Sequence, residues 1–275
     1  MEYSLIAVDI DGTLLNDHSE LSDENIKSIE ALSQKGIAVV PVTGRTYYEI
    51  PKVVRDCESI RFFVYSNGSC IFDRDQGTVY SSTIPCDTAA EIFSLLDSYE
   101  TYTEVYSGGY PWADAAKLSA ECFDYYGISR RFQKIIEKSR KTVSDFSAEL
   151  KSGRLKPELF NSFFRFERER DACQERLYKR FPDIEAVSSL GLNLEVMNEG
   201  TNKGTGLMKL CDIIGIDTAE VIAIGDNEND IRLFEIADRR CAVSNACDKL
   251  KSMATDIICS NNEHVIDYVE KNILC

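Results

Sequence analysis

The sequence contains few of the residues on which many enzymes depend. Among its 275 residues are only two histidines, His18 and His264, and neither lies in a recognisable catalytic pattern. The ten cysteines are scattered, with no C-x-x-C pair and no cysteine–histidine cluster at zinc-binding spacing, so we interpret them as reduced thiols. A histidine-centred hydrolase is therefore not expected, and the chemistry must be sought among carboxylates.

Basic residues and long apolar runs are also scarce. Lys and Arg number 31 against 46 Asp and Glu, which gives a net charge of −15, so nucleic acid and anionic membrane surfaces would be repelled. No stretch approaches the ~18 apolar residues of a membrane span, and the first residues do not resemble a signal peptide. We expect a cytoplasmic protein that binds neither nucleic acid nor membrane.

Composition and length indicate a globular chain of about two domains. The sequence is 44% hydrophobic and 28% charged, which excludes a disordered or low-complexity chain. At about 150 residues per domain, 275 residues correspond to two domains, with one large α/β domain as the alternative.

The first forty-five residues predict a strand, a helix and a strand. Residues 5–8 and 37–42 are continuous apolar runs of the kind found in buried parallel sheets. Between them, Ser22 is a plausible N-cap and Gly36 stands where a helix-ending glycine belongs. The ligand site of such a βαβ unit lies beyond the carboxyl ends of its strands.

The same pattern returns near the C-terminus, so both ends of the chain are predicted to build one sheet. A helix after Asn202 ends at Gly215, an apolar strand follows at 221–224, weaker strands lie at 242–243 and 256–259, and a terminal helix spans 265–273. Asn67-Gly68 predicts a hairpin turn. The fold class is α/β: a Rossmann-like, doubly wound parallel-sheet core over 1–83 and 191–275.

Residues 84–190 are predicted to form an inserted α+β domain. Helices are expected near 87–99, 117–138 and 168–180, and alternating patterns indicate strands near 103–107, 160–166 and 184–189. Strands and helices in such runs, without the continuous apolar strands of the core, are typical of a sheet covered on one face. The insertion is a candidate lid.

Acidic residues follow two of the predicted strands. Asp9 and Asp11 stand two positions apart at a strand end with Gly12 behind them, and Asp226 and Asp230 follow the strand at 221–224. Each group alone is compatible with an ordinary turn or helix cap. If the two strands are parallel neighbours, however, Asp9 and Asp226 converge, and such hard oxygen ligands suit Mg²⁺.

Phosphate-binding donors accompany these acids. Thr43, Gly44 and Arg45 follow the second strand, and Lys203 begins a helix. A hydroxyl, backbone N–H groups, a guanidinium and an ammonium are the donors that a phosphoryl group requires. Lys203 alone would be interpreted as a solvated surface lysine, but the four clusters together favour a phosphate site.

The sequence resembles the haloacid dehalogenase (HAD) superfamily of phosphotransferases. Four motifs carry the resemblance: D-x-D-G-T-L at 9–14, T-G-R at 43–45, N-K-G at 202–204 and G-D-x-x-N-D at 225–230. The position of the insertion is similar to that in Cof-type phosphatases with a C2B cap, which sets substrate specificity. One departure is C-A-V-S-N-A at 241–246, where that subfamily usually has G-V-A-M-G-N-A, so that Ser244 replaces a glycine.

The resemblance implies a role for each residue. Asp9 would be the nucleophile that forms an aspartyl-phosphate, and Asp11 would protonate the leaving oxygen and then deprotonate water. Mg²⁺ would be bound by the Asp9 carboxylate, the Asp11 backbone carbonyl and Asp226, with Asp230 supporting Asp226 and Lys203. The phosphoryl oxygens would be held by Thr43, Gly44, Lys203 and Asn229.

Several residues keep two interpretations. Arg45 contacts phosphate or substrate, or forms a salt bridge that orders its loop. Asn67 is a hairpin turn or contributes to a pocket that faces the cap. Ring stacking with a ligand or ordinary packing is expected for Tyr106, Tyr110 and Trp112. The basic run at 130–141 is a solvated helix face or a site for a second anionic group.

The expected function is Mg²⁺-dependent hydrolysis of phosphomonoesters among small metabolites such as sugar phosphates or nucleotide-derived cofactors. A phosphomutase on the same core is one alternative, and it would require a bisphosphate for turnover. A catalytically silent phosphate- or metal-sensing protein is another, although binding alone does not need Asp11. A receiver-type signalling domain would leave the insertion and Asp11 without a role.

Overall fold

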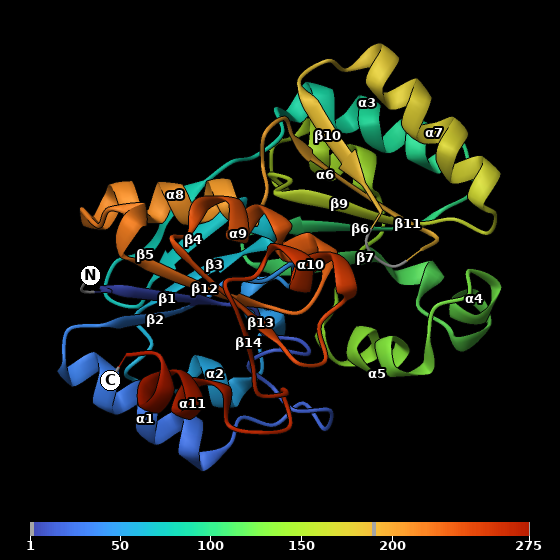
Figure 1. Ribbon diagram of the computed structural model, residues 1–275. Coiled ribbons are helices and arrows are strands. Elements are labelled where there is room, and N and C mark those ends of the chain that lie inside the picture. The colour runs from blue at the N-terminus through green and yellow to red at the C-terminus, as the bar shows by residue number, and fades with distance from the viewer. Residues whose placement is uncertain (1–2, 189–190, 275) are drawn as a thin grey trace. The chain divides into compact units, whose positions relative to one another are not determined.

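A computed structural model describes residues 3–188 and 191–274, which form two compact units (Figure 1). We call them the core unit, comprising the chain up to Arg45, Ile50–Tyr80 and the chain from Asn202 onward, and the inserted unit, comprising Thr46–Glu49 and Ser81–Thr201. The sequence predicts an insertion over 84–190, whereas the inserted unit continues past that limit. The reason is strand β11 (Asn193–Asn198), which pairs with strands of the insertion on both sides.

The core unit is built on a five-stranded parallel sheet. Its strands lie in the order β14-β13-β12-β1-β2. They span Asp256–Ile258, Arg239–Val243, Val221–Gly225, Leu5–Val8 and Ala38–Pro41, respectively. Leu5 is in register with Val221 on one side and Ala38 on the other. Every residue of β1 is buried, as its continuous apolar run predicts, and the predicted parallel sheet built from both ends of the chain is confirmed.

Helices cover both faces of this sheet. In Figure 1, α1 and α11 lie side by side on one face, and α8 and α9 lie on the other. The core helices are α1 (Asp23–Gln34), α2 (Lys52–Arg55), α8 (Lys203–Ile214), α9 (Ile231–Ile236), α10 (Asp248–Met253) and α11 (Val265–Asn272). The predicted helix signals are confirmed: Ser22 caps α1 by accepting the N–H of Asn25, and α8 ends at left-handed Gly215.

A three-stranded antiparallel sheet completes the core unit. It consists of β3 (Phe62–Tyr65), β4 (Cys70–Asp73) and β5 (Gly77–Ser81). The predicted hairpin at Asn67-Gly68 is confirmed, and three consecutive residues of its turn, Ser66, Asn67 and Gly68, have positive φ. A side chain at Gly68 is also excluded by space, because a Cβ there would lie 2.1 Å from the carbonyl oxygen of Asn202.

The inserted unit contains a six-stranded sheet in the order β10-β11-β9-β6-β7-β8. The strands other than β11 are β6 (Tyr102–Ser107), β7 (Tyr110–Asp114), β8 (Lys141–Val143), β9 (Leu159–Phe163) and β10 (Ile184–Val187). The helices are α3 (Cys86–Asp97), α4 (Ala120–Tyr125), α5 (Arg130–Ser139), α6 (Phe146–Lys151) and α7 (Glu167–Arg180). One apolar cluster joins α3, α6 and α7 to the sheet, and a second joins α4 and α5 to it.

The prediction for this unit is partly wrong in its details. The single helix expected near 117–138 is two helices, α4 and α5, separated by Gly127 at φ +66°. Strands β7, β8 and β11 and helix α6 were not predicted. The strand expected near 184–189 corresponds to β10, and its last expected residue, position 189, lies outside the described residues.

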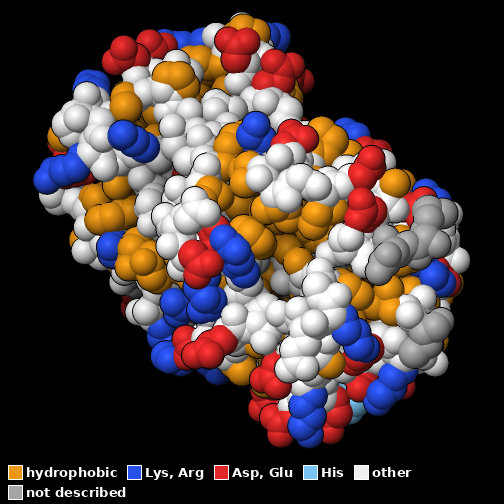
Figure 2. All heavy atoms as spheres, turned by 90° about the vertical axis from the view of Figure 1, so that its left-hand side faces the viewer, with side chains coloured by type: hydrophobic (Ala, Val, Ile, Leu, Met, Phe, Trp, Pro, Cys, Tyr) orange, Lys and Arg blue, Asp and Glu red, His pale blue; other side chains and the backbone are white. Residues whose placement is uncertain are grey.

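The amino ends of β1 and β2 carry a groove of about 830 Å³. Its lining includes Ser4, Ala38, Phe62, Arg61 and Ile213. The face of the molecule shown in Figure 2 has hydrophobic side chains interspersed with charged ones of both signs. Since Asp9 and Thr43 follow the carboxyl ends of the same strands, the groove is not where the predicted chemistry lies.

Among the described helices, none has the length and apolar character needed to cross a membrane. The nine cysteines of the described ranges are free thiols, and Cys275 lies outside those ranges.

Candidate active site

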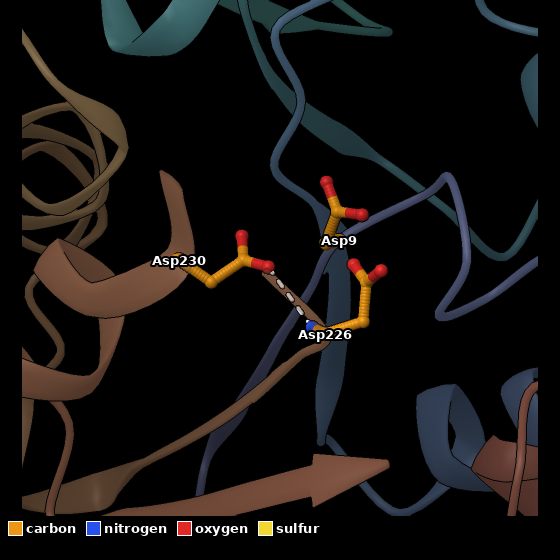
Figure 3. A group of neighbouring side chains, drawn as sticks. All are labelled: Asp9, Asp226 and Asp230. Carbon is orange, nitrogen blue, oxygen red and sulfur yellow. Dashed lines mark hydrogen bonds between the residues drawn. The ribbon is translucent and has the colours of Figure 1, made fainter. Parts of the chain in front are cut away.

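The site begins where β1 and β12 end. These neighbouring strands run parallel, with Val8 in register with Ile224, so the residues that follow them emerge at one edge of the sheet. Asp9, Asp226 and Asp230 each place a carboxylate oxygen within 4.8 Å of the others. Figure 3 shows the three side chains converging on one space, with Asp230 reaching it from the turn after β12. Residues more than 200 positions apart in sequence thus form one acidic cluster.

Lys203 lies inside this cluster. Its ammonium group donates to Asp9 Oδ1 at 2.6 Å and to Asp230 Oδ1 at 2.7 Å, and its side chain is 1% exposed. The interpretation as a solvated surface lysine is therefore wrong. Asn202 positions Lys203, because the side chains of Asn202 and Thr205 form a capping box that fixes the first turn of α8.

The charges in the cluster do not balance. Three carboxylates face one ammonium, and burial is the largest contribution that raises the pKa of Asp9 well above its usual value. Burial, followed by repulsion from Asp230, likewise raises the pKa of Asp226 to about 6. Burial alone would lower the pKa of Lys203, but Asp230 and Asp9 raise it overall, so this lysine stays charged. The unbalanced negative charge favours a bound cation.

Asp230 differs from the other two acids because both its oxygens are used within the protein. Oδ1 accepts from Lys203, and Oδ2 accepts the backbone N–H groups of Asp226 at 3.0 Å and Asn227 at 3.2 Å. Asp230 therefore orients Lys203 and the backbone that carries Asp226. Asp9 and Asp226 are the better placed carboxylates for a metal ion.

Gly12 and Thr13 approach Asp226 from the first motif. Thr13 is fully buried, and its hydroxyl donates to Asp226 Oδ1 at 3.2 Å. The carbonyl oxygen of Gly12 accepts from the side chain of Asn245 at 2.8 Å. The role of Thr13 was missed in the sequence, although its place directly after the D-x-D-G pattern was a usable signal.

The loop at 241–246, where Ser244 stands in place of a glycine, is held in place. Besides its contact with Gly12, Asn245 accepts the backbone N–H of Asn261 at 2.9 Å, and the N–H of Ser244 donates to the carbonyl oxygen of Cys259 at 3.2 Å. Ser244 itself is exposed, so its side chain has room.

Thr43, Gly44 and Arg45 form a loop that is fastened to the hairpin turn. The carbonyl oxygens of Thr43 and Arg45 accept the N–H groups of Asn67 and Ser66, at 3.0 and 2.8 Å. A Cβ on Gly44 would lie 2.9 Å from Asn67 Oδ1. Asn67 is therefore both a turn residue and a brace for this loop.

Arg45 forms a two-point ion pair with Asp11. Its Nε donates to Asp11 Oδ2 at 2.6 Å and its Nη2 to Asp11 Oδ1 at 2.7 Å. Of the two interpretations of Arg45, the structure shows the salt bridge, and the partner is the other acid of the first motif. Asn229 is exposed on the turn Glu228–Asp230, and no hydrogen bond joins its side chain to the described residues of the cluster.

The aromatic residues and the basic run of the inserted unit contact other protein groups. Tyr110 stacks on Tyr48 at a centroid distance of 3.8 Å, and the Lys141 ammonium lies 3.3 Å from the centroid of the Tyr110 ring. Tyr106 is buried against Leu159 and Met197, and the ring nitrogen of Trp112 donates to the Ser107 carbonyl. These observations favour packing over ligand stacking.

The side chain of Arg140, within the basic run, is fully buried. Its guanidinium pairs with Glu104 through two contacts of 2.6 and 2.8 Å and also with Glu49. Arg130, in contrast, forms an exposed pair with Asp124. The side chain of Arg131 lies outside what the structure describes. The interpretation of the basic run as a solvated helix face is therefore wrong for Arg140. Its guanidinium is already paired with two carboxylates of the protein, those of Glu49 and Glu104.

A family model described as haloacid dehalogenase-like hydrolase matches residues 6–269. The chain belongs to this family. It is 28% identical to phosphatase YwpJ of Bacillus subtilis, and the match covers 98% of this chain and 99% of that relative. It is 29% identical to 5-amino-6-(5-phospho-D-ribitylamino)uracil phosphatase YwtE of the same organism, covering 98% and 97%.

Solved structures agree with the family assignment. A haloacid dehalogenase-like hydrolase from B. subtilis superposes with a TM-score of 0.81 at 26% identity, over 98% of this chain and all of the other. This haloacid dehalogenase-like hydrolase is thus a phosphatase of the Cof type, as the four motifs indicate.

Proposed function

We propose that this phosphatase hydrolyses small phosphorylated metabolites with the help of Mg²⁺, through an aspartyl-phosphate on Asp9. The observation that carries the proposal is the buried cluster in which Lys203 lies between Asp9 and Asp230 while Asp226 faces Asp9. A nucleophilic carboxylate, a fixed ammonium for a phosphoryl oxygen and a second carboxylate for a cation are the parts that phosphoryl transfer needs.

The donor set fits Mg²⁺. Asp9 presents a buried carboxylate and Asp226 a half-buried one. The pKa values of both are raised, so their ionised forms gain from a cation. Together with the backbone carbonyl of Asp11, they would hold the ion. When bound, Mg²⁺ neutralises part of the charge on the phosphoryl group and on these acids.

The residues of the chain divide the reaction into two steps. In the first, an Asp9 oxygen bonds to phosphorus while the bond from phosphorus to the leaving oxygen breaks, and Asp11 gives its proton to that oxygen. In the second, water attacks the aspartyl-phosphate, Asp11 takes a proton from the water, and Asp9 is released with inorganic phosphate. Thr43, the Gly44 N–H, Lys203 and Asn229 are the proposed holders of the phosphoryl oxygens.

The relatives guide the choice of substrates. YwtE is named for a phosphorylated ribitylaminouracil, so the panel contains sugar phosphates, nucleotide-derived cofactors and polyol phosphates that carry a heterocycle. Phosphate release is measured with Mg²⁺ and with EDTA, for the wild type and for Asp9→Asn. The proposal is supported if phosphate is released by the wild type in Mg²⁺ but neither in EDTA nor by Asp9→Asn. If the wild type releases no phosphate from any substrate of the panel but still binds Mg²⁺, a sensing role is favoured. Activity only after addition of a bisphosphate favours a mutase.

A further inference from the structure

We propose that Asn245 is a positioning residue for the metal site, because it fixes the backbone of the first motif beside Asp226. This inference rests on the proposed function, in which two carboxylates and one backbone carbonyl hold Mg²⁺. The loop at 241–246 departs from the family pattern but keeps Asn245, and the proposed mechanism gives this side chain no role. Its Nδ2 donates to the carbonyl oxygen of Gly12 at 2.8 Å.

The peptide unit between Gly12 and Thr13 connects two groups of the site. On one side it follows Asp11, whose backbone carbonyl is a proposed ligand of the ion. On the other side Thr13 is fully buried, and its hydroxyl donates to Asp226 Oδ1 at 3.2 Å. Because a peptide unit is planar, a hydrogen bond to the Gly12 oxygen fixes the orientation of the whole unit. This bond does not compete for the Asp11 carbonyl oxygen.

Asn245 can hold Gly12 although its side chain is exposed. Its Oδ1 accepts the backbone N–H of Asn261 at 2.9 Å. An N–H group on one side and a carbonyl oxygen on the other determine which end of the amide is oxygen and which is nitrogen. Asn261 is 6% exposed, and its side chain donates to the Leu15 carbonyl oxygen at 3.1 Å. The amide of Asn245 is thus held at both ends, and little freedom remains to be lost when an ion binds.

The segment that carries Asn245 also contacts the fourth motif. The N–H of Cys247 donates to the backbone carbonyl oxygen of Asp226 at 2.8 Å. Residues 245–247 therefore hold both sides of the site, one at Gly12 and one at Asp226. A Cβ on Gly12 would lie 2.5 Å from Asp226 Oδ2, so a small shift of Gly12 displaces a proposed ligand. Loss of the Asn245 contact should loosen the spacing of the ligands more than it weakens the fold.

The experiment measures the Kd of Mg²⁺ by calorimetry for the metal-free wild type and for Asn245→Ala, with no phosphate ester present. We expect the Kd to rise about 10-fold, since residues that orient metal ligands typically contribute ~10–100-fold to affinity.

Hydrolysis of the panel substrate that the wild type cleaves fastest gives a second readout. The Mg²⁺ concentration for half of the full activity should rise by a similar factor, whereas kcat at saturating Mg²⁺ should stay within about 3-fold of the wild type. A protein that is only destabilised would behave in the opposite way. Its active fraction, and hence its apparent kcat, would fall at an unchanged half-saturating concentration.

Asn262→Ala is the matched control. Asn262 is also an exposed asparagine that joins the C-terminal part of the chain to the segment after the first motif. Its Oδ1 accepts the N–H of Asp17 at 3.1 Å, and its Nδ2 donates to Asp17 Oδ2 at 3.0 Å. Asp17 has no part in the proposed site, so this variant should bind Mg²⁺ as the wild type does. Urea unfolding should show both variants folded, because truncation of an exposed side chain leaves no buried cavity.

The positioning role is overturned if Asn245→Ala binds Mg²⁺ within about 2-fold of the wild type, well below the contribution of a residue that orients ligands. It is also overturned if Asn262→Ala loses as much affinity as Asn245→Ala. In both cases a wild type that binds Mg²⁺ and releases phosphate leaves the proposed function standing. If the wild type takes up no Mg²⁺, the proposed function and the role of Asn245 fail together.

Discussion

Gly12 and Asp226 are separated by more than 200 residues in sequence, but in the fold no space for a methyl group is left between them. A Cβ built on Gly12 would lie 2.5 Å from Asp226 Oδ2, and Gly12 has φ +77°. Two constraints therefore act on this position, one from the backbone and one from the neighbouring carboxylate.

Gly12→Ala should consequently displace Asp226 and remove most of the activity. Gly36→Ala separates the two constraints, because Gly36 has φ +82° and a Cβ at this position would have nothing within 4 Å. We expect Gly36→Ala to lose about 1–2 kcal/mol of unfolding free energy, the cost of a left-handed residue, with full activity. Gly12→Ala should lose more unfolding free energy than Gly36→Ala does, and its kcat/KM should fall at least tenfold. Urea unfolding and phosphate release measure both variants, and equal behaviour of the two would rule out the steric argument.

Asp226→Asn should stabilise the metal-free protein at neutral and alkaline pH. The pKa of Asp226 is about 6 in the folded state, above the ordinary value of 3.8, so the folded state binds more protons between these values. The free energy of unfolding therefore falls as pH rises through this window, and the penalty is complete above about pH 6. In EDTA at about pH 8 the variant should be about 1–3 kcal/mol more stable than the wild type, and the difference should shrink toward about pH 4. Urea unfolding at both pH values checks this, and a wild type as stable as the variant at about pH 8 would contradict it.

Lys203→Met should destabilise the core unit, because it leaves Asp9 and Asp230 buried without their cation. Breaking a buried pair costs about 3–5 kcal/mol. Lys209→Met, on the exposed side of the same helix, is the control and should change stability by less than about 0.5 kcal/mol. Chemical unfolding distinguishes the two, and a loss for Lys203→Met no larger than for the control would argue against the buried pair.

Arg140→Met should have a similar effect on the inserted unit. It removes the cation that faces the buried carboxylates of Glu49 and Glu104, with an expected loss of about 3–5 kcal/mol. Arg130→Met removes an exposed pair with Asp124 and should cost at most about 1 kcal/mol. Unfolding monitored in both variants tests this, and the prediction fails if the two losses match.

The ends of the core strands could be predicted because a buried parallel strand has a distinctive pattern. The apolar run of β1 stops at Asp9 and that of β12 stops before Asp226, so the polar residue after each run marks the sheet edge. Parallel pairing then brings these residues together whatever their separation in sequence. The acidic cluster needed only this rule.

Contacts that depend on three-dimensional neighbours could not be predicted in this way. Arg140 and Glu49 are 91 residues apart, and the sequence around each gives no signal that the two are neighbours. Strand β7 contains Pro111 and β8 has only three residues, so neither carries a strand period. The pairing of Arg45 with Asp11 likewise depends on how the loop at 43–45 is fastened to the hairpin turn.

The strand order of the core sheet also determines when the catalytic centre can exist during translation. β1 lies between β2 and β12, and β12, which begins at Val221, is translated only after the whole inserted unit. A nascent chain that ends before β12 therefore carries the proposed nucleophile Asp9 without Asp226 or Asp230. The proposed phosphoryl chemistry therefore requires β12 and the turn that follows it to have been made.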